Sequence, residues 1–180
     1  MRLFLAIVLI LTVQVAARPP KSAPAWGPTA DGLRVGVRFV AGRVEATLHN
    51  AGKKDVVLNL GVMLANGARH YPSALRITAV DARGQERTLV IEPAFVAGRL
   101  DPLIMPLSAG ARYTVPLDLG TAVVQGKGDR LAAGKYRIQV GYQGKRVPKT
   151  AVPDMPGLAL MNYWEGRVQS AVIEYVHAAR

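Results

Sequence analysis

Apolar and polar residues alternate along much of this chain, and the alternation is clearest over residues 134–142. Gly134 opens this segment with a tight turn, and every second position from Tyr136 to Tyr142 is apolar or aromatic. A repeat of two residues over this length is typical of a β-strand with one buried face. The chain is therefore expected to be organised around this strand. Its buried face is predicted to consist of Tyr136, Ile138, Val140 and Tyr142.

The same alternation recurs in seven other segments and predicts an all-β fold of about eight strands. In the first of them, every second residue from Leu33 to Phe39 is expected to point inward. A turn with Asp81 first and Gly84 last predicts a hairpin between two others. No window without Gly and Pro has the spacing of an amphipathic helix. The seven segments are 33–39, 44–48, 56–60, 75–79, 86–91, 112–119 and 171–176.

Three longer segments break the alternation and are predicted to be connections. Residues 61–72 contain the turn pair Asn66-Gly67, and residues 92–110 hold three prolines and two glycines. Residues 143–162 hold three more prolines, although residues 158–161 could form one helical turn.

The first 17 residues have the features of a secretory signal peptide. A positive charge at Arg2 precedes an unbroken apolar run from Leu3 to Leu11, and small residues end at Ala17. Cleavage after Ala17 is expected, with an uncleaved membrane anchor as the alternative. Residues 18–25 would then be a Pro-rich leader and residues 26–180 the folded domain. No later segment is apolar over the length needed to cross a bilayer.

The chain contains no cysteine, so it has neither a disulfide nor a lipid-attachment site. A secreted domain without disulfides must rely on its hydrophobic core, and a domain of this length can bury one. The sequence has no Asn-x-Ser/Thr acceptor and is rich in Ala, Gly, Val and Arg, which favours a bacterial exported protein, periplasmic or secreted.

Five short motifs follow one another along the chain, each with Gly, Asn or Tyr at a position that turns and corners of β-proteins require. They are Trp26-Gly27-x4-Gly32-Leu33, Leu48-x-Asn50-x-Gly52, Val80-Asp81-x2-Gly84, Leu131-x2-Gly134-x-Tyr136 and Trp164-x-Gly166-x-Val168-x-Ser170. In this order they resemble the exported immunoglobulin-like domains of bacteria, most of unknown function. Among named families, the proteinase-inhibitor-like β-sandwich domains are the nearest by pattern.

This resemblance covers residues 26–176 and implies a two-layer antiparallel sandwich of seven or eight strands. It also implies that the Tyr136 hydroxyl caps backbone groups at a corner before the second-to-last strand. It implies no activity, because sandwiches carry many unrelated functions. No motif here matches a reactive inhibitory loop.

The net charge of +11 favours anionic partners such as nucleic acid, acidic polysaccharide, lipid headgroups or an acidic protein. Most of the basic residues alternate with apolar ones, so they also fit the solvated face of strands. The densest basic cluster is Lys145, Arg146 and Lys149.

Catalytic and metal-binding signatures are weak. The three histidines, His49, His70 and His177, lie at no ligand spacing from one another or from a carboxylate, so neither a metal nor a cofactor is predicted. No serine sits in Gly-x-Ser-x-Gly. Several carboxylates lie in or beside the predicted connections, but no spacing forces two of them together. A hydrolase that uses such carboxylates is the least favoured interpretation.

Two connections remain as the candidate binding surface. If the strands follow immunoglobulin order, segments 61–74 and 143–167 emerge at the same end and display bulky residues. Alternatively, Trp164 and Leu160 fold back and cover the open end of the core. The candidate surface residues are His70, Tyr71, Lys145, Arg146, Lys149, Met155, Leu158, Met161, Tyr163 and Trp164.

The sequence therefore predicts an exported, non-enzymatic module that binds a protein or an anionic envelope component through its end loops. An accessory or inhibitory module for an exported peptidase is the alternative. No small-molecule substrate is evident.

Overall fold

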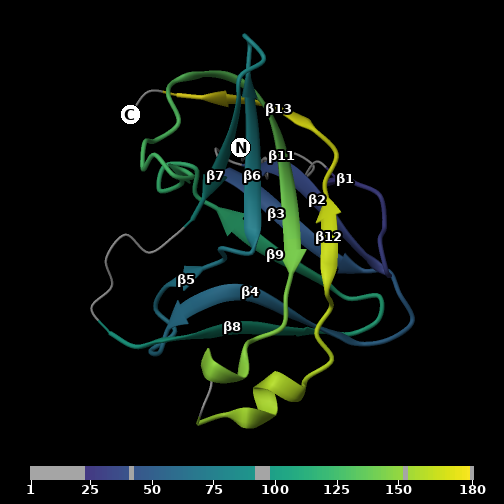
Figure 1. The fold of residues 1–180 in the computed structure, drawn as a ribbon. Helices are drawn as coiled ribbons and strands as arrows, with labels where there is room; N and C mark the ends of the chain where they lie inside the picture. Colours follow the sequence, from purple (N-terminus) through teal and green to yellow (C-terminus); the bar gives the residue numbers. More distant parts are fainter. Residues whose placement is uncertain (1–22, 41–42, 92–97, 152–153, 179–180) are drawn as a thin grey trace, which may run out of the picture.

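The protein is an all-β sandwich built from three antiparallel sheets (Figure 1). The computed structural model describes residues 23–40, 43–91, 98–151 and 154–178. The predicted signal peptide and most of the leader therefore lie outside the described residues. Within the described ranges, no helix is long and apolar enough to span a bilayer.

The first sheet has the strand order β1-β2-β3-β9. Its strands are β1 (Ala25–Trp26), β2 (Leu33–Val40), β3 (Arg43–Asn50) and β9 (Arg112–Leu117).

The second sheet has the order β10-β7-β6-β11-β12, and β13 pairs with β11 beyond the end of β12. Its central strand is the expected one, extended to eleven residues. Its strands are β6 (Leu75–Asp81), β7 (Glu86–Val90), β10 (Val123–Val124), β11 (Gly134–Gly144), β12 (Gly166–Gln169) and β13 (Ile173–His177).

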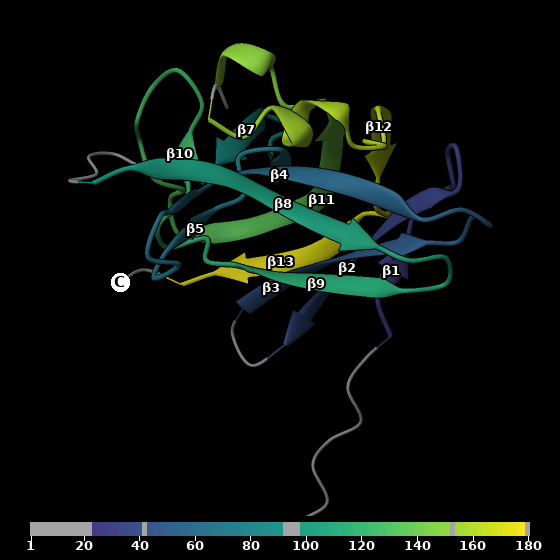
Figure 2. The ribbon, with the colours of Figure 1, turned by 90° about the horizontal axis from the view of Figure 1, so that it is seen from below.

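The third sheet has the order β5-β4-β8 and lies across one end of the sandwich (Figures 1 and 2). It consists of β4 (Val56–Leu64), β5 (His70–Tyr71) and β8 (Leu100–Leu107). Two short 3-10 helices follow β11 below this sheet in Figure 1, η1 (Lys149–Ala151) and η2 (Pro156–Leu160).

One continuous core lies between the sheets, because the inward positions of all three are apolar. Val35 and Leu48 from the first sheet are fully buried, as are Ile138 and Val140 from the second and Leu58 from the third. The alternation predicted for β2, β3, β6 and β11 is confirmed at the level of single residues, with one exception. Phe39 was expected inside but is 44% exposed, because it lies near the end of β2. Its ring packs edge-to-face with that of Tyr175, with 5.3 Å between the ring centres.

The first and third sheets are joined by a sharply bent two-stranded ribbon. β3 pairs with β9, and their continuations β4 and β8 pair with each other after the bend. Asn50 holds the bend: its buried side-chain amide donates to the carbonyls of Lys54 at 2.8 Å and Leu107 at 2.9 Å. Its side-chain oxygen accepts a hydrogen bond from the Gly52 N–H. The motif around Asn50 is therefore a corner device.

The Tyr136 corner that the resemblance implied is also present. The Tyr136 hydroxyl donates a hydrogen bond of 2.9 Å to the carbonyl of Ala132, just before β11. The ring itself is buried in the main core.

Two predicted connections contain strands that the sequence did not reveal. Residues 92–110 include β8, although Pro102 and Pro106 are residues that disfavour the interior of a strand. Proline is tolerated there because β8 is at the edge of its sheet, where an N–H would have no ladder partner. Residues 61–72 include the end of β4 and the short β5, because a bulge at Gly61 carries β4 beyond its predicted end.

The closing segment also differs from the prediction. The expected strand over residues 171–176 is present as β13, but a second strand, β12, precedes it where no strand was predicted. Ser170 lies at the break between them. Its N–H donates to the Val140 carbonyl, and its hydroxyl accepts from the Val140 N–H, so the ladder to β11 is maintained through the break.

Candidate ligand-binding groove

The outer face of the second sheet carries a polar groove whose floor is Gly141. Strand alternation turns the polar residues of β6, β7, β11 and β12 away from the core and toward this face. The register places Gly141 of β11 directly between Arg76 of β6 and Gln169 of β12. In the next row, Gln143 lies beside Arg167. The missing side chain at Gly141 leaves a depression between longer neighbours.

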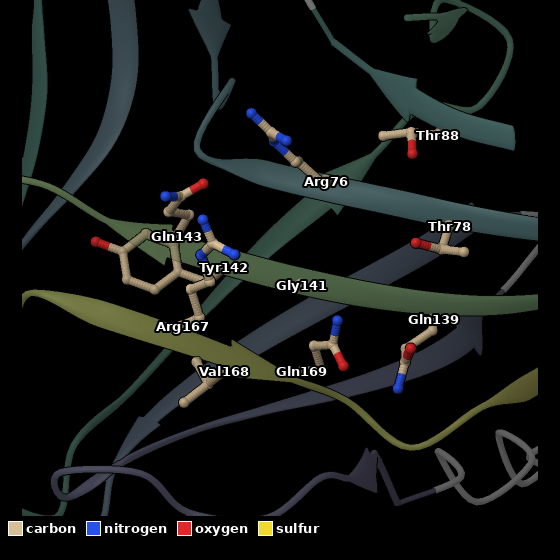
Figure 3. A pocket seen from close by; sticks show the side chains of 10 residues that line it. All are labelled: Arg76, Thr78, Thr88, Gln139, Gly141, Tyr142, Gln143, Arg167, Val168 and Gln169. Carbon is tan, nitrogen blue, oxygen red and sulfur yellow. The ribbon is translucent and has the colours of Figure 1, made fainter.

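This depression is a cavity of about 220 Å³ (Figure 3). A Cβ atom added to Gly141 would come no closer than 3.6 Å to any neighbour, which is ordinary van der Waals contact. The floor is therefore open, and glycine is not required there by crowding. A glycine in the interior of a strand often marks a place where a ligand approaches closely. The lining residues are Arg76, Thr78, Thr88, Gln139, Gly141, Tyr142, Gln143, Arg167, Val168 and Gln169.

Most polar side chains of the groove form no hydrogen bond with another described residue. Gln139 donates to the Ser170 carbonyl at 2.8 Å. Neither Arg76 nor Arg167 is in any ion pair between described residues. No carboxylate is among the residues that line this cavity. Two guanidinium groups surrounded by amides and hydroxyls form a surface suited to an anionic, hydrogen-bonding ligand.

A second depression extends the groove toward the third sheet. It has a volume of about 230 Å³ and shares Arg76 and Gln143 with the first. Lys145 adds a third basic side chain, and Asn59 and Ser73 add polar groups. The two cavities share part of their lining, and the name groove is used below for both together.

Two of the sequence-predicted surface residues belong to the interior instead. Trp164 and Tyr163 are each only 5% exposed. The Trp164 indole donates to the Asp31 carbonyl at 3.1 Å, and its ring lies 5.6 Å from that of Tyr142. The segment was expected either to expose Trp164 as part of a binding surface or to fold it back over the core. Trp164 is buried and covers the core.

The Tyr163 ring forms a small cluster of its own with Val147. Burial raises the pKa of the Tyr163 hydroxyl, which has no hydrogen-bond partner among the described residues. Leu158 and Met161 are half-buried against this cluster, so they too serve packing.

Other residues of the predicted surface remain exposed. Arg146 forms an ion pair of 3.1 Å with Glu165, also exposed, and donates to the Ala159 carbonyl. Lys145 and Lys149 are exposed, and Met155 is 42% exposed. Leu160, the second residue of the covering alternative, does not cover the core, because it is 75% exposed.

His70 and Tyr71 do not join the other predicted residues. His70 pairs with Met63 at one end of β4, whereas Tyr163 bridges to Val57 near the other end. Six residues of strand separate these positions, which corresponds to about 20 Å. The two end loops therefore do not form one surface through these residues. In the part of the chain that the structure describes, no three His, Asp or Glu side chains gather as a metal site would require.

No family model matches the chain, and no curated protein matches it either. Of the groove residues, the sequence-based surface included only Lys145. Arg76 and Gln139 follow the alternation of ordinary solvated strands, so neither position stands out in the sequence. The other three residues, Gln143, Arg167 and Gln169, lie outside the strands predicted from the sequence. The available signal was Gly141, a glycine in the middle of the most regular strand.

Proposed function

We propose that the protein is a non-enzymatic binding module that holds an acidic polysaccharide in the groove. The observation that carries this proposal is the composition of the groove around Gly141. Three basic side chains, Arg76, Arg167 and Lys145, line it without any carboxylate. A polymer with regularly spaced carboxylate or sulfate groups would supply the missing negative charge.

The neutral part of the lining favours a saccharide over a nucleic acid. Glutamine and threonine side chains both donate and accept, which matches the hydroxyl groups of sugars. Binding of single-stranded nucleic acid relies on exposed aromatic rings that stack on bases. The one aromatic residue in the lining, Tyr142, is buried, and its hydroxyl donates to the Asn59 carbonyl.

The predicted export of the chain supports the same ligand class, because acidic polysaccharides are exposed outside the cytoplasm. The overall charge of +11 would add long-range attraction toward such a polymer. This attraction alone is not specific, so the test must distinguish binding by the groove residues from attraction by the net charge of the protein.

Calorimetric titration with a uronic-acid oligosaccharide at about 0.15 M salt tests the proposal. Arg76→Gln removes one groove cation and should weaken binding by about tenfold. Arg83→Gln removes the same charge from an exposed hairpin turn and should change the affinity by less than about twofold. An equal loss of affinity in the two variants would mean that binding depends on the overall positive charge and not on the groove, which would contradict the proposal.

Gly141→Val provides a second, charge-neutral variant. Valine suits a strand, and the floor has space for its Cβ, so the fold should persist. The new side chain would occupy the cavity and should lower the affinity at least as much as Arg76→Gln. Unchanged affinity in a folded Gly141→Val protein would exclude the groove as the binding site.

A further inference from the structure

A second basic cluster lies on the outer face of the first sheet, away from the groove. Arg34 of β2, His49 of β3 and Arg112 of β9 occupy one row across the three strands. Trp26 of β1 lies over the neighbouring row, above Gly36. Because the first and second sheets pack against each other through their inner faces, this cluster and the groove lie on opposite sides of the sandwich.

Trp26 brings the two arginines together. The guanidinium carbon of Arg34 lies 4.5 Å from the centre of the indole ring, and that of Arg112 lies 5.5 Å from it. A side chain at position 36 would exclude the ring, because a Cβ there would lie 2.7 Å from the indole. The glycine thus allows the indole to rest on the sheet and serve as a platform for both cations.

His49 fixes the orientation of Arg34. The Arg34 Nε–H donates to the His49 Nδ1 at 3.0 Å, so this nitrogen carries no proton. Burial, followed by the positive charges of Arg34 and Arg112, lowers the pKa of His49. The contact uses only the Nε–H of Arg34, so its two terminal nitrogens are available for another partner.

The two arginines have no counter-charge in the described structure. Arg38, on the same face of β2, is paired with Glu45 across the strand. The equivalent cross-strand partner of Arg34 is the neutral His49, and neither Arg34 nor Arg112 is in any ion pair among the described residues. Both guanidinium carbons lie within 5.5 Å of the centre of the same ring, so they are at most about 10 Å apart.

We propose that Trp26, Arg34 and Arg112 form a second binding site, specific for an oxyanion such as the sulfate or carboxylate group of an acidic polymer. A planar guanidinium presents paired N–H donors that match the oxygens of such a group. A bound oxyanion would also supply the counter-charge that the two arginines lack among the described residues. This site does not rest on the function proposed for the groove.

Inorganic sulfate is the probe that tests the site, with the ionic strength held constant by sodium chloride. The NMR signals of the Arg34 Nε–H and the Trp26 indole N–H report directly on the cluster. Both should shift along a saturable curve as sulfate replaces chloride. A shift that is linear, or equal in chloride alone, would overturn the proposal.

Variants separate this site from the net charge and from the groove. Arg112→Gln should weaken sulfate binding by about tenfold or more, and Arg112→Lys should weaken it by several-fold although the charge is kept. Arg83→Gln, the matched control for charge, should leave the curve unchanged. Arg76→Gln should also leave it unchanged, since that residue belongs to the groove. Equal losses in Arg83→Gln and Arg112→Gln, or loss of the titration in Arg76→Gln, would contradict a separate site.

Discussion

Two buried tyrosine rings place their hydroxyls in opposite situations. The Tyr136 hydroxyl donates to the Ala132 carbonyl, whereas the Tyr163 hydroxyl is buried with no partner among the described residues. Burying a polar group without a hydrogen bond costs free energy, and a hydrogen bond to the buried group offsets that cost. The same chemical change at the two sites should therefore have opposite effects.

Removal of the Tyr136 hydroxyl in Tyr136→Phe should lower the free energy of unfolding by about 1 kcal/mol or more. Tyr163→Phe is the matched control and should keep or raise this free energy. Urea denaturation of the two variants measures both values. An unchanged stability in Tyr136→Phe would show that the corner hydrogen bond does not stabilise the fold.

His49 makes stability depend on pH through its lowered pKa. The folded protein holds this proton less tightly than the unfolded chain does, so the stability from neutral His49 is full above about pH 6.5. It is lost as the pH falls through the folded-state pKa, because protonation places a third charge between Arg34 and Arg112 and removes the acceptor for the Arg34 Nε–H.

Melting temperatures from about pH 8 to pH 5 test this dependence. His49→Asn supplies a side-chain oxygen near the position of Nδ1 but cannot titrate. Its melting temperature should fall less over this range than that of the natural chain, whatever the offset between them at pH 8. Parallel curves would mean that His49 does not contribute to acid destabilisation.

At the scale of the elements, the bend between β3 and β4 depends on one side chain. Asn50 is 1% exposed and uses both amide hydrogens on main-chain carbonyls, those of Lys54 and Leu107. An aspartate side chain would have the same shape, but its negative charge would face the carbonyl oxygens of Lys54 and Leu107 without a hydrogen to donate to them. Asn50→Asp should therefore lower the free energy of unfolding at neutral pH by about 3 kcal/mol.

Asn66→Asp is the matched control for this substitution. Asn66 is exposed, and its side-chain oxygen accepts from the Ala68 N–H, which a carboxylate does equally well. This variant should retain the stability of the natural chain in urea denaturation. If Asn50→Asp were equally well tolerated, the bend would be held by the surrounding backbone and not by Asn50.

Local chemistry explains which elements the sequence predicted. β11 was predicted because every second residue from Tyr136 to Tyr142 is apolar or aromatic, and all four of these residues are buried. The turn between β6 and β7 was predicted because Asp81 suits its first position, where the carboxylate accepts hydrogen bonds from the N–H groups of Gln85 and Arg83. The bond from Gln85, and then that from Arg83, lowers the pKa of this carboxyl group. β8 was missed because its prolines are compatible only with an edge, and edge position is decided by the whole sheet.

At the scale of the whole molecule, both proposed sites are made from residues far apart in the sequence. Arg76 and Gln169 become neighbours only because β6 and β12 reach Gly141 from opposite sides. Trp26, Arg34 and Arg112 likewise come from three different strands. Each of these residues occupies an ordinary solvent-facing position of a strand. The two sites could therefore not be predicted without the pairing order of the strands, which local alternation does not encode.

The prolines of the bent ribbon have a consequence for how crowded copies of this protein behave. Pro102 and Pro106 lie in β8 and Pro116 lies in β9, the strands that terminate the third and first sheets. A neighbouring copy that tried to extend either sheet would find donor positions missing along this margin. Strand-to-strand association between copies through this margin is therefore disfavoured.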